Sequence, residues 1–305
     1  MHFFSSNNSP VWFKGIVLGF FAYKTRFLQP TNNVCCNLNT ANKHKINDLI
    51  YNTPMHTYLL SDLHLTPDRP KVIGAFLNFL RKEAKTAERI YILGDLFEFW
   101  IGDDAAEKLG AGPLLKAMKE VSETVDCYFM AGNRDFLVRE QFTELTGFKI
   151  LEDETVVDLY GTPTLLLHGD SLCTDDHAHQ QFRKDIVTNR AFCDELLSLT
   201  IDERLAKAKE ARQKSNEHKS TISMGIMDVT QSAVLDAFEK YNIKQMIHGH
   251  THRQNIHKYD KQCTRYVLGD WHTTNSIMKA DAKGLKIHNR KVWLQAVLFL
   301  IFRKK

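Results

Sequence analysis

Five short apolar runs in this chain each end in side chains that can bind a metal ion. Such runs are typical of buried strands, and a neighbouring glycine lets the backbone turn sharply where a strand ends. The five clusters are Ser61-Asp62-Leu63-His64, Gly94-Asp95, Gly132-Asn133-Arg134-Asp135, His168-Gly169-Asp170 and His248-Gly249-His250-Thr251-His252. A strand that stops in Asp, Asn or His places a ligand at the edge of its sheet. We therefore expect one shared metal site rather than five unrelated turns.

The order of the predicted elements indicates an α/β sandwich. Between Met55 and Ala191 strands alternate with helical segments, and Lys71–Ala87 and Ala105–Thr124 carry apolar residues at helical spacing. Residues 177–240 have almost no strand pattern and are rich in Lys, Glu, Ala and Gln. We interpret this span as a helical cap inserted between two ligand clusters, with a solvated helix on the far side as the alternative.

The domain is expected to cover residues 55–288. Residues 1–54 lack a sustained hydrophobic period, so we expect an extension without a catalytic role, with Met55 as the natural start and a membrane or targeting arm as the alternative. Residues 289–305 form an apolar and basic tail. Its apolar part, Val292–Phe302, is too short to span a bilayer. It could lie on a membrane surface, or be a core helix or a frayed end.

Bulk composition excludes several classes of protein. The 305 residues are 43% apolar, which supports a buried core. The net charge of +4 comes from basic residues interspersed with acidic ones, so no nucleic-acid partner is expected. Six cysteines without a CxxC pair indicate reduced thiols in a cytoplasmic protein.

The ligand types predict a centre with two divalent ions. Such a pair, about 3.5–4 Å apart, needs a bridging carboxylate together with terminal nitrogen and oxygen ligands. Asp95 is the natural bridge, and the remaining predicted ligands are Asp62, His64, Asn133, His168, His248 and His250. Asp62 and His64 can reach one ion only if the backbone bends out of the pleat between them. Imidazole and oxygen ligands without thiolate suit Mn, Fe or Zn rather than Ca.

Each motif alone has a simpler explanation. A single Asp-x-His is more often a turn or a surface pair, and Gly-Asn-Arg-Asp could be a β-turn. Arg134 could form a structural salt bridge with Asp135, and Asp103 and Asp104 could orient a ligand histidine or merely close a turn. The ordered set of all five clusters is much more specific than any one of them.

The five clusters resemble the signature blocks of the calcineurin-like metallophosphoesterases, over residues 56 to about 275. Further strings, Tyr91–Glu98, Trp100–Asp104, His168–Asp176 and Ile226–Val229, are similar to those of the UDP-2,3-diacylglucosamine pyrophosphatases of lipid A synthesis. The resemblance implies a four-layer αββα fold whose helical cap holds the acyl chains. It also implies hydrolysis of a lipid-linked UDP-sugar to UMP and 2,3-diacylglucosamine 1-phosphate, by water attacking the α-phosphorus.

The resemblance further implies a site and a location. One Mn²⁺ would be held by Asp62, His64, Asp95 and His250, and a second by Asp95, Asn133, His168 and His248. Asp95 and Arg134 would be catalytic, with Arg134 placing two donors on a phosphate. The substrate contacts implied are Asn133, Arg134, Asp176, Ser215, Asn216, Lys219 and His248, although the cap contacts fit the family spacing in no single register. A peripheral position on the cytoplasmic face of the inner membrane follows from the lipid substrate.

Two other functions remain open at this point. The metal clusters suit any phosphodiesterase or nucleotide-diphosphate-sugar hydrolase of the superfamily, because specificity resides in the cap. A fold that has become a non-catalytic scaffold would be expected to lose ligands, and every ligand type is present in this chain.

Overall fold

The computed structural model describes residues 55–221 and 228–289. For residues 216–221 and Lys261 it describes the backbone only. The predicted extension 1–54 and the segment 290–305 lie outside the described residues, as does the apolar run Val292–Phe302. Four cysteines lie in the described part of the chain: Cys127, Cys173 and Cys193 are buried, and Cys263 is partly buried.

The first sheet has six strands in the order β11-β10-β1-β2-β3-β4. These strands are β1 (His56–Leu60), β2 (Arg89–Leu93), β3 (Asp126–Met130), β4 (Lys149–Leu151), β10 (Ser276–Asp281) and β11 (Gly284–Asn289). Strands β1 to β4 run parallel, with Leu60 opposite Ile92 and Leu93 opposite Met130. This register brings the residues that follow the three strands to the same edge of the sheet.

The second sheet has five strands in the order β5-β6-β7-β9-β8. They are β5 (Thr155–Leu159), β6 (Thr162–Leu166), β7 (Gln245–His248), β8 (Asn255–Lys258) and β9 (Thr264–Val267). Strands β6, β7 and β9 are parallel, and Leu166 lies opposite Ile247. The clusters that begin at His168 and His248 therefore leave the second sheet side by side.

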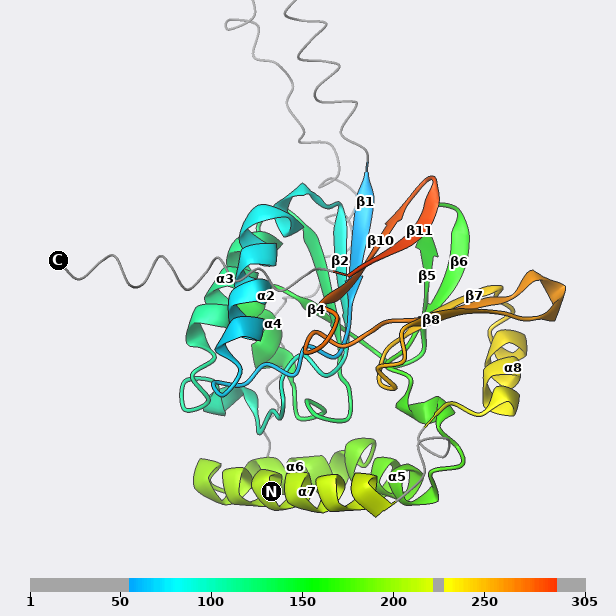
Figure 1. The fold of residues 1–305 in the computed structure, drawn as a ribbon. Helices are drawn as coiled ribbons and strands as arrows, with labels where there is room; N and C mark the ends of the chain where they lie inside the picture. The colour runs from blue at the N-terminus through cyan, green and yellow to red at the C-terminus, as the bar shows by residue number, and fades with distance from the viewer. Residues whose placement is uncertain (1–54, 222–227, 290–305) are drawn as a thin grey trace, which may run out of the picture. The chain divides into compact units, whose positions relative to one another are not determined.

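Three apolar clusters separate four layers, which confirms the predicted αββα sandwich (Figure 1). Helices α2 (Pro70–Lys82), α3 (Gly112–Ser122) and α4 (Glu140–Thr146) cover the outer face of the first sheet. Alternation along each strand sends Leu59 between the two sheets and Leu60 toward these helices. Helix α8 (Gln231–Lys240) packs on the second sheet through Val234 and Phe238.

Residues 177–221 form a separate group of helices beside the sandwich (Figure 1). The group consists of α5 (His177–Phe182), a π-helical turn (Arg183–Val187), α6 (Arg190–Ser198) and α7 (Ile201–Thr221). The predicted cap also included residues 231–240, but these form α8 and belong to the outer layer of the sandwich. Across the described ranges, we find no helix with the length and apolar character needed to cross a bilayer.

Candidate metal centre

The backbone leaves the strand conformation where the ligand side chains begin. Asp62, His64, Asp95, His250 and His252 all have positive φ, between 47° and 64°. A left-handed conformation costs a non-glycine residue about 1–2 kcal/mol, and such strain gathers at functional sites. At Asp62 and His64 it supplies the bend out of the pleat that the sequence required. Both side chains now face the same space.

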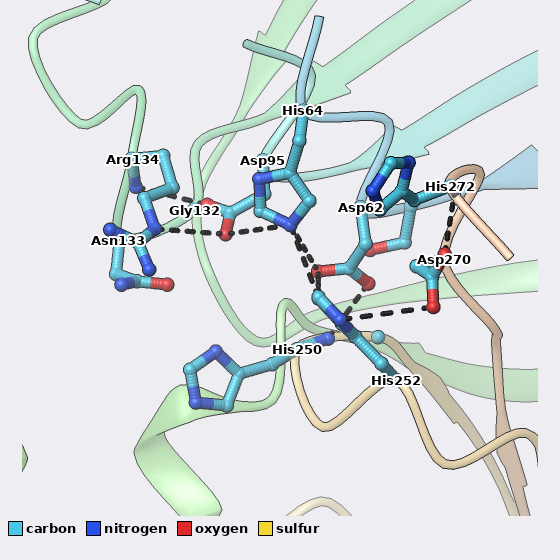
Figure 2. A network of polar contacts seen from close by, with 12 residues as sticks. Asp62, His64, Asp95, Gly132, Asn133, Arg134, His250, His252, Asp270 and His272 are labelled. Atoms are coloured by element: carbon cyan, nitrogen blue, oxygen red, sulfur yellow. Dashed lines mark hydrogen bonds and ion pairs between the residues drawn. The ribbon is translucent and has the colours of Figure 1, made fainter. Parts of the chain in front are cut away.

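Asp62, His64 and His252 form one half of the cluster (Figure 2). Nε2 of His252 lies 3.2 Å from Oδ1 of Asp62 and 3.1 Å from Nε2 of His64. Nε2 of His64 lies 3.9 Å from both Oδ1 of Asp62 and Oδ2 of Asp95. Two ligands about 2.1 Å from a common ion are themselves separated by roughly 3–3.5 Å, so these atoms have the spacing of a shared cation site.

His168 is at the centre of the other half. Its Nε2 lies 3.6 Å from Oδ1 of Asp95, 3.2 Å from Oδ1 of Asn133 and 3.3 Å from Nδ1 of His250. Asp62, Asp95 and His168 also place ligand atoms within 4.8 Å of one another. The two oxygens of Asp95 thus face both halves, which is the position that a bridging carboxylate requires.

The ligand rings are oriented by groups behind them. Nδ1 of His168 lies 2.9 Å from the carbonyl oxygen of Leu93, so this nitrogen donates and Nε2 faces the site. Carboxylates stand 3.9 Å behind two further rings, Glu98 behind His64 and Asp270 behind His252. Neither carboxylate was predicted from the sequence. Glu98 lies within a string that the family resemblance singled out, but nothing marked it as an acceptor for a histidine.

His248 does not face the cluster, contrary to the sequence-based prediction. Its Nε2 lies 3.1 Å from Nη1 of Arg265, and its Nδ1 lies 2.9 Å from the carbonyl oxygen of Gly249. Both ring nitrogens are thus engaged by the protein, and the ring is fully buried. His252, which was not among the predicted ligands, has its Nε2 inside the cluster instead. The two histidines of this segment that converge on the site are His250 and His252.

Asp103 and Asp104 do not orient a ligand histidine. Asp103 accepts hydrogen bonds from Nε1 of Trp100 and from the backbone amides of Arg139 and Phe142, which secures the start of α4. Asp104 binds Arg204 of the cap. Both carboxylates therefore have structural partners, and of the two roles considered for them the orientation of a ligand histidine is the one that these contacts do not support.

Arg134 and Asp135 have separate roles. Asp135 is buried and accepts hydrogen bonds from the backbone amides of Asp95, Leu96 and Gly132, so it fixes the ligand loops. The amide of Arg134 donates to Oδ1 of Asp95 at 2.9 Å, and its Nε lies 3.9 Å from Oδ2 of Asp95. The Nε atom of Arg134 is buried without a hydrogen-bond partner. The salt bridge considered between Arg134 and Asp135 is replaced by contacts of each with the Asp95 loop.

The remaining predicted substrate contacts lie on the cap. Asp176 is buried and is the N-cap of α5, where its Oδ1 accepts a hydrogen bond from the amide of His179. Ser215 lies on α7 and is partly buried. Asn216 and Lys219 are on the same helix, but their side chains lie outside the described residues.

Buried charges give this cluster its electrostatic character. Burial alone would lower the pKa of His168, but the negative charges of Asp95, Asp170 and Asp62 outweigh it and raise the pKa to about 9. Burial lowers the pKa of His64 to about 3, against the attraction of Asp62. The pKa of Asp95 is raised, chiefly by burial. Carboxylates buried this close to one another are stabilised by positive charge beside them. The ring of His168 carries such a charge as a proton, at a position where a metal ion could bind instead.

One glycine allows the first sheet's loops to meet. A Cβ atom on Gly132 would lie 2.3 Å from Oδ1 of Asp95, so any larger residue would push the carboxylate away. The donor set, its burial and this close packing all fit divalent transition ions. Oδ1 of Asp62 is buried and accepts no hydrogen bond, so a bound ion would satisfy it.

Sequence comparison with known proteins agrees with this geometry. The family profile described as calcineurin-like phosphoesterase matches residues 55–254. This chain belongs to the calcineurin-like phosphoesterases. A UDP-2,3-diacylglucosamine hydrolase from Xanthomonas campestris pv. campestris is 44% identical over 244 residues, covering 76% of this chain and 98% of the relative. One from Stenotrophomonas maltophilia is 44% identical over 241 residues, covering 75% and 96%.

Comparison with solved structures gives only distant matches. An archaeal phosphodiesterase aligns with 14% identity and a TM-score of 0.42, covering 77% of this chain and 100% of that chain. The family assignment rests on the sequence matches, which extend over nearly the full length of the relatives. The chain is therefore a phosphoesterase of this family, and its enzymatic class is a metal-dependent hydrolase.

Proposed function

We propose that this enzyme hydrolyses the pyrophosphate bond of UDP-2,3-diacylglucosamine, releasing UMP and 2,3-diacylglucosamine 1-phosphate. The observation that carries the proposal is the convergence of Asp62, Asp95 and His168 at the edge of the sandwich, in a chain 44% identical to hydrolases of that name. A pyrophosphate is negatively charged, so water attacks it poorly unless the charge is neutralised. A site that gathers cation ligands around a buried carboxylate is suited to that task.

We assign two Mn²⁺ sites from the positions of the side chains. Asp62, His64, Asp95 and His252 would hold one ion, and Asp95, Asn133, His168 and His250 the other. The assignment replaces His248 by His252 and moves His250 to the second ion. When bound, such ions lower the pKa of a water molecule and neutralise phosphoryl oxygens.

The chain's own side chains supply the rest of the chemistry. Asp95 lies between the two halves of the site. Its Oδ1 also accepts a hydrogen bond from the backbone amide of Arg134, which fixes the position of that residue. The Nε of Arg134 makes no hydrogen bond and lies 3.9 Å from Oδ2 of Asp95, so it can donate to a phosphoryl oxygen as negative charge develops on it. Leu93 and Asp270 keep the imidazoles of His168 and His252 in place. Asn133 adds a neutral oxygen beside His168.

The cap is the proposed site of the lipid. Asp176 opens α5, whose His179 ring lies 5.2 Å from the ring of His250, so this end of the cap stands next to the metal centre. Asp176 and Ser215 are the described residues that we propose as sugar or phosphate contacts, with Asn216 and Lys219 as further candidates on α7. A lipid substrate also requires access to a membrane, so we propose a peripheral location on the inner face of the inner membrane.

Turnover of UDP-2,3-diacylglucosamine tests the proposal. With added Mn²⁺ we expect release of UMP in equal amount to the lipid phosphate, and we expect a chelator to abolish it. Restoring Mn²⁺ after chelation should restore the rate, which separates metal loss from unfolding. Cleavage of a simple phosphodiester without UMP release would assign the enzyme to a different phosphodiesterase reaction. Metal-independent UMP release would contradict the proposed mechanism.

A further inference from the structure

Cap helix α7 is attached to the sandwich through a buried cation. Among its described side chains, Ile201 to Ser215, only that of Arg204 is buried, with 5% of the residue exposed. A helix normally docks through an apolar stripe, and a buried charge is retained only with good partners. The attachment of α7 therefore depends strongly on what surrounds the guanidinium of Arg204.

The guanidinium contacts a single loop. Its Nη1 donates to the carbonyl oxygen of Ile101 at 2.6 Å and to Oδ1 of Asp104 at 2.8 Å, while Nη2 donates to Oδ2 of Asp104 at 2.5 Å. This is the bidentate geometry of an arginine–carboxylate pair, in which the guanidinium is buried and the side chain of Asp104 is half-exposed. Gly102 makes room for it, because a Cβ there would lie 2.3 Å from Nη1 of Arg204. With φ at +121°, Gly102 also has a backbone conformation that other residues rarely adopt.

The loop that receives Arg204 begins at the bridging carboxylate. Residues 95–104 run from Asp95 to Asp104, and the amide of Trp100 donates to the carbonyl oxygen of Arg134 at 3.0 Å. The Trp100 ring stacks on Phe97 with centroids 4.4 Å apart. The loop is thus fixed to the metal centre at its start and along its length. A second contact from α7, the ion pair between Arg212 and Glu98, reaches the same loop.

We propose that Arg204 is a positioning residue that fixes α7 to the 95–104 loop and thereby sets how tightly the lipid substrate binds. The inference rests on the proposed function, because it assigns the lipid to the cap. Arg204 itself contacts loop residues rather than metal ligands. Its loss should loosen the cap without dismantling the metal centre.

Variants of the pair test this proposal in the full-length enzyme. Arg204→Gln should raise KM for UDP-2,3-diacylglucosamine tenfold or more, with kcat changed less than threefold. Arg204→Lys keeps the charge but loses the planar fork, and should give an intermediate KM. Asp104→Asn leaves the bond to Ile101 in place, so we expect a folded protein with a smaller rise in KM. The matched control is Asp202→Asn, which removes the exposed ion pair between α7 and Lys108 and should leave KM unchanged.

Two further readouts distinguish positioning from general damage. Amide hydrogen exchange of α7, measured without substrate, should become at least tenfold faster in Arg204→Gln and stay unchanged in the control. The affinity for Mn²⁺ should remain within twofold of the parent. A parallel loss of kcat and Mn²⁺ affinity, or unchanged KM and unchanged exchange, would overturn the proposal. If the parent enzyme released no UMP, the proposed function would be wrong. Amide hydrogen exchange in α7 would then still test whether Arg204 holds the helix in place.

Discussion

The metal centre and the cap are held in place by different means. Around the metal centre, Asp62, Asp95 and His168 are almost completely buried, and their positions follow from strand ends and, at Asp62 and Asp95, from left-handed backbone. In the cap, α7 is polar and largely exposed, and it depends on a few ion pairs made by arginines such as Arg204. The difference teaches that the ligand positions are built into the sandwich, whereas the position of α7 depends on a small number of replaceable ion pairs.

The largest effect is expected at the bridge between the two halves of the centre. Asp95→Asn keeps the size of the side chain but removes the charge that faces both His64 and His168. We expect UMP release to fall roughly 1000-fold or more, because in the proposed centre this charge serves both ions. Asp126→Asn is the control, since Asp126 is exposed and forms a surface ion pair with Lys149. Activity within tenfold of the parent would rule out a bridging role for Asp95.

A pair of substitutions tests whether His252 is a metal ligand and whether His248 has only a structural role. His252→Asn should weaken Mn²⁺ binding by roughly 100-fold or more, since even residues behind metal ligands cost 10–100-fold. His248→Asn should leave Mn²⁺ affinity within threefold but lower the free energy of unfolding by about 1–3 kcal/mol, because Arg265 loses a buried partner. Calorimetric titration and thermal unfolding measure the two quantities. The reverse pattern would restore the original prediction that His248 is a ligand.

Metal affinity should depend on pH over an unusual range. The pKa of His168 is about 9, so its ring is protonated at neutral pH and an ion must displace that proton. Lowering the pH from 9 to 7 should therefore reduce Mn²⁺ affinity by roughly tenfold per unit, with release of about one proton from this ring on binding. Titration in buffers of different ionisation enthalpy counts the released protons. An affinity that stays constant across this range would contradict the charge distribution described for the centre.

The smallest effect is expected on the exposed surface of the cap. Arg190 and Asp194 of α6 form an ion pair of 3.4 Å in which both side chains are more than half exposed. Arg190→Gln should change the free energy of unfolding by less than about 0.5 kcal/mol and leave KM unchanged. Denaturant unfolding measures the first quantity. A loss comparable to that of Arg204→Gln would mean that cap attachment is spread over its whole surface rather than concentrated at Arg204.

The sandwich could be predicted because its signals are local. Apolar runs that end before Asp95, Asn133 or His168 predict an α/β sandwich and the edge at which the ligands meet, whereas the four-layer order was implied by the family resemblance. The segment His248–His252 was harder, because in a regular strand its three histidines would all point to the same side. Positive φ at His250 and His252 breaks that alternation and turns both into the site, while His248 remains at the end of β7. No pattern in the sequence indicates where such a bend begins.

The cap was predictable as a set of helices but not in its attachments. Residues 231–240 have a helical pattern like the rest of the span, and only packing of Val234 and Phe238 on the second sheet assigns α8 to the sandwich. Asp104 was singled out beside Asp103, but its partner Arg204 is 100 residues away in a lysine-rich segment. Long-range charge pairs of this kind leave no periodic signal in a single sequence.

Anomalous diffraction from crystals grown with Mn²⁺ tests the central claim most directly. We expect two manganese peaks about 3.5–4 Å apart, with Asp95 between them, His252 on the ion beside His64, and His250 on the ion beside His168. A single peak, or two peaks that Asp95 does not join, would contradict the two-metal centre. Density linking an ion to His248 would contradict the assignment of His252.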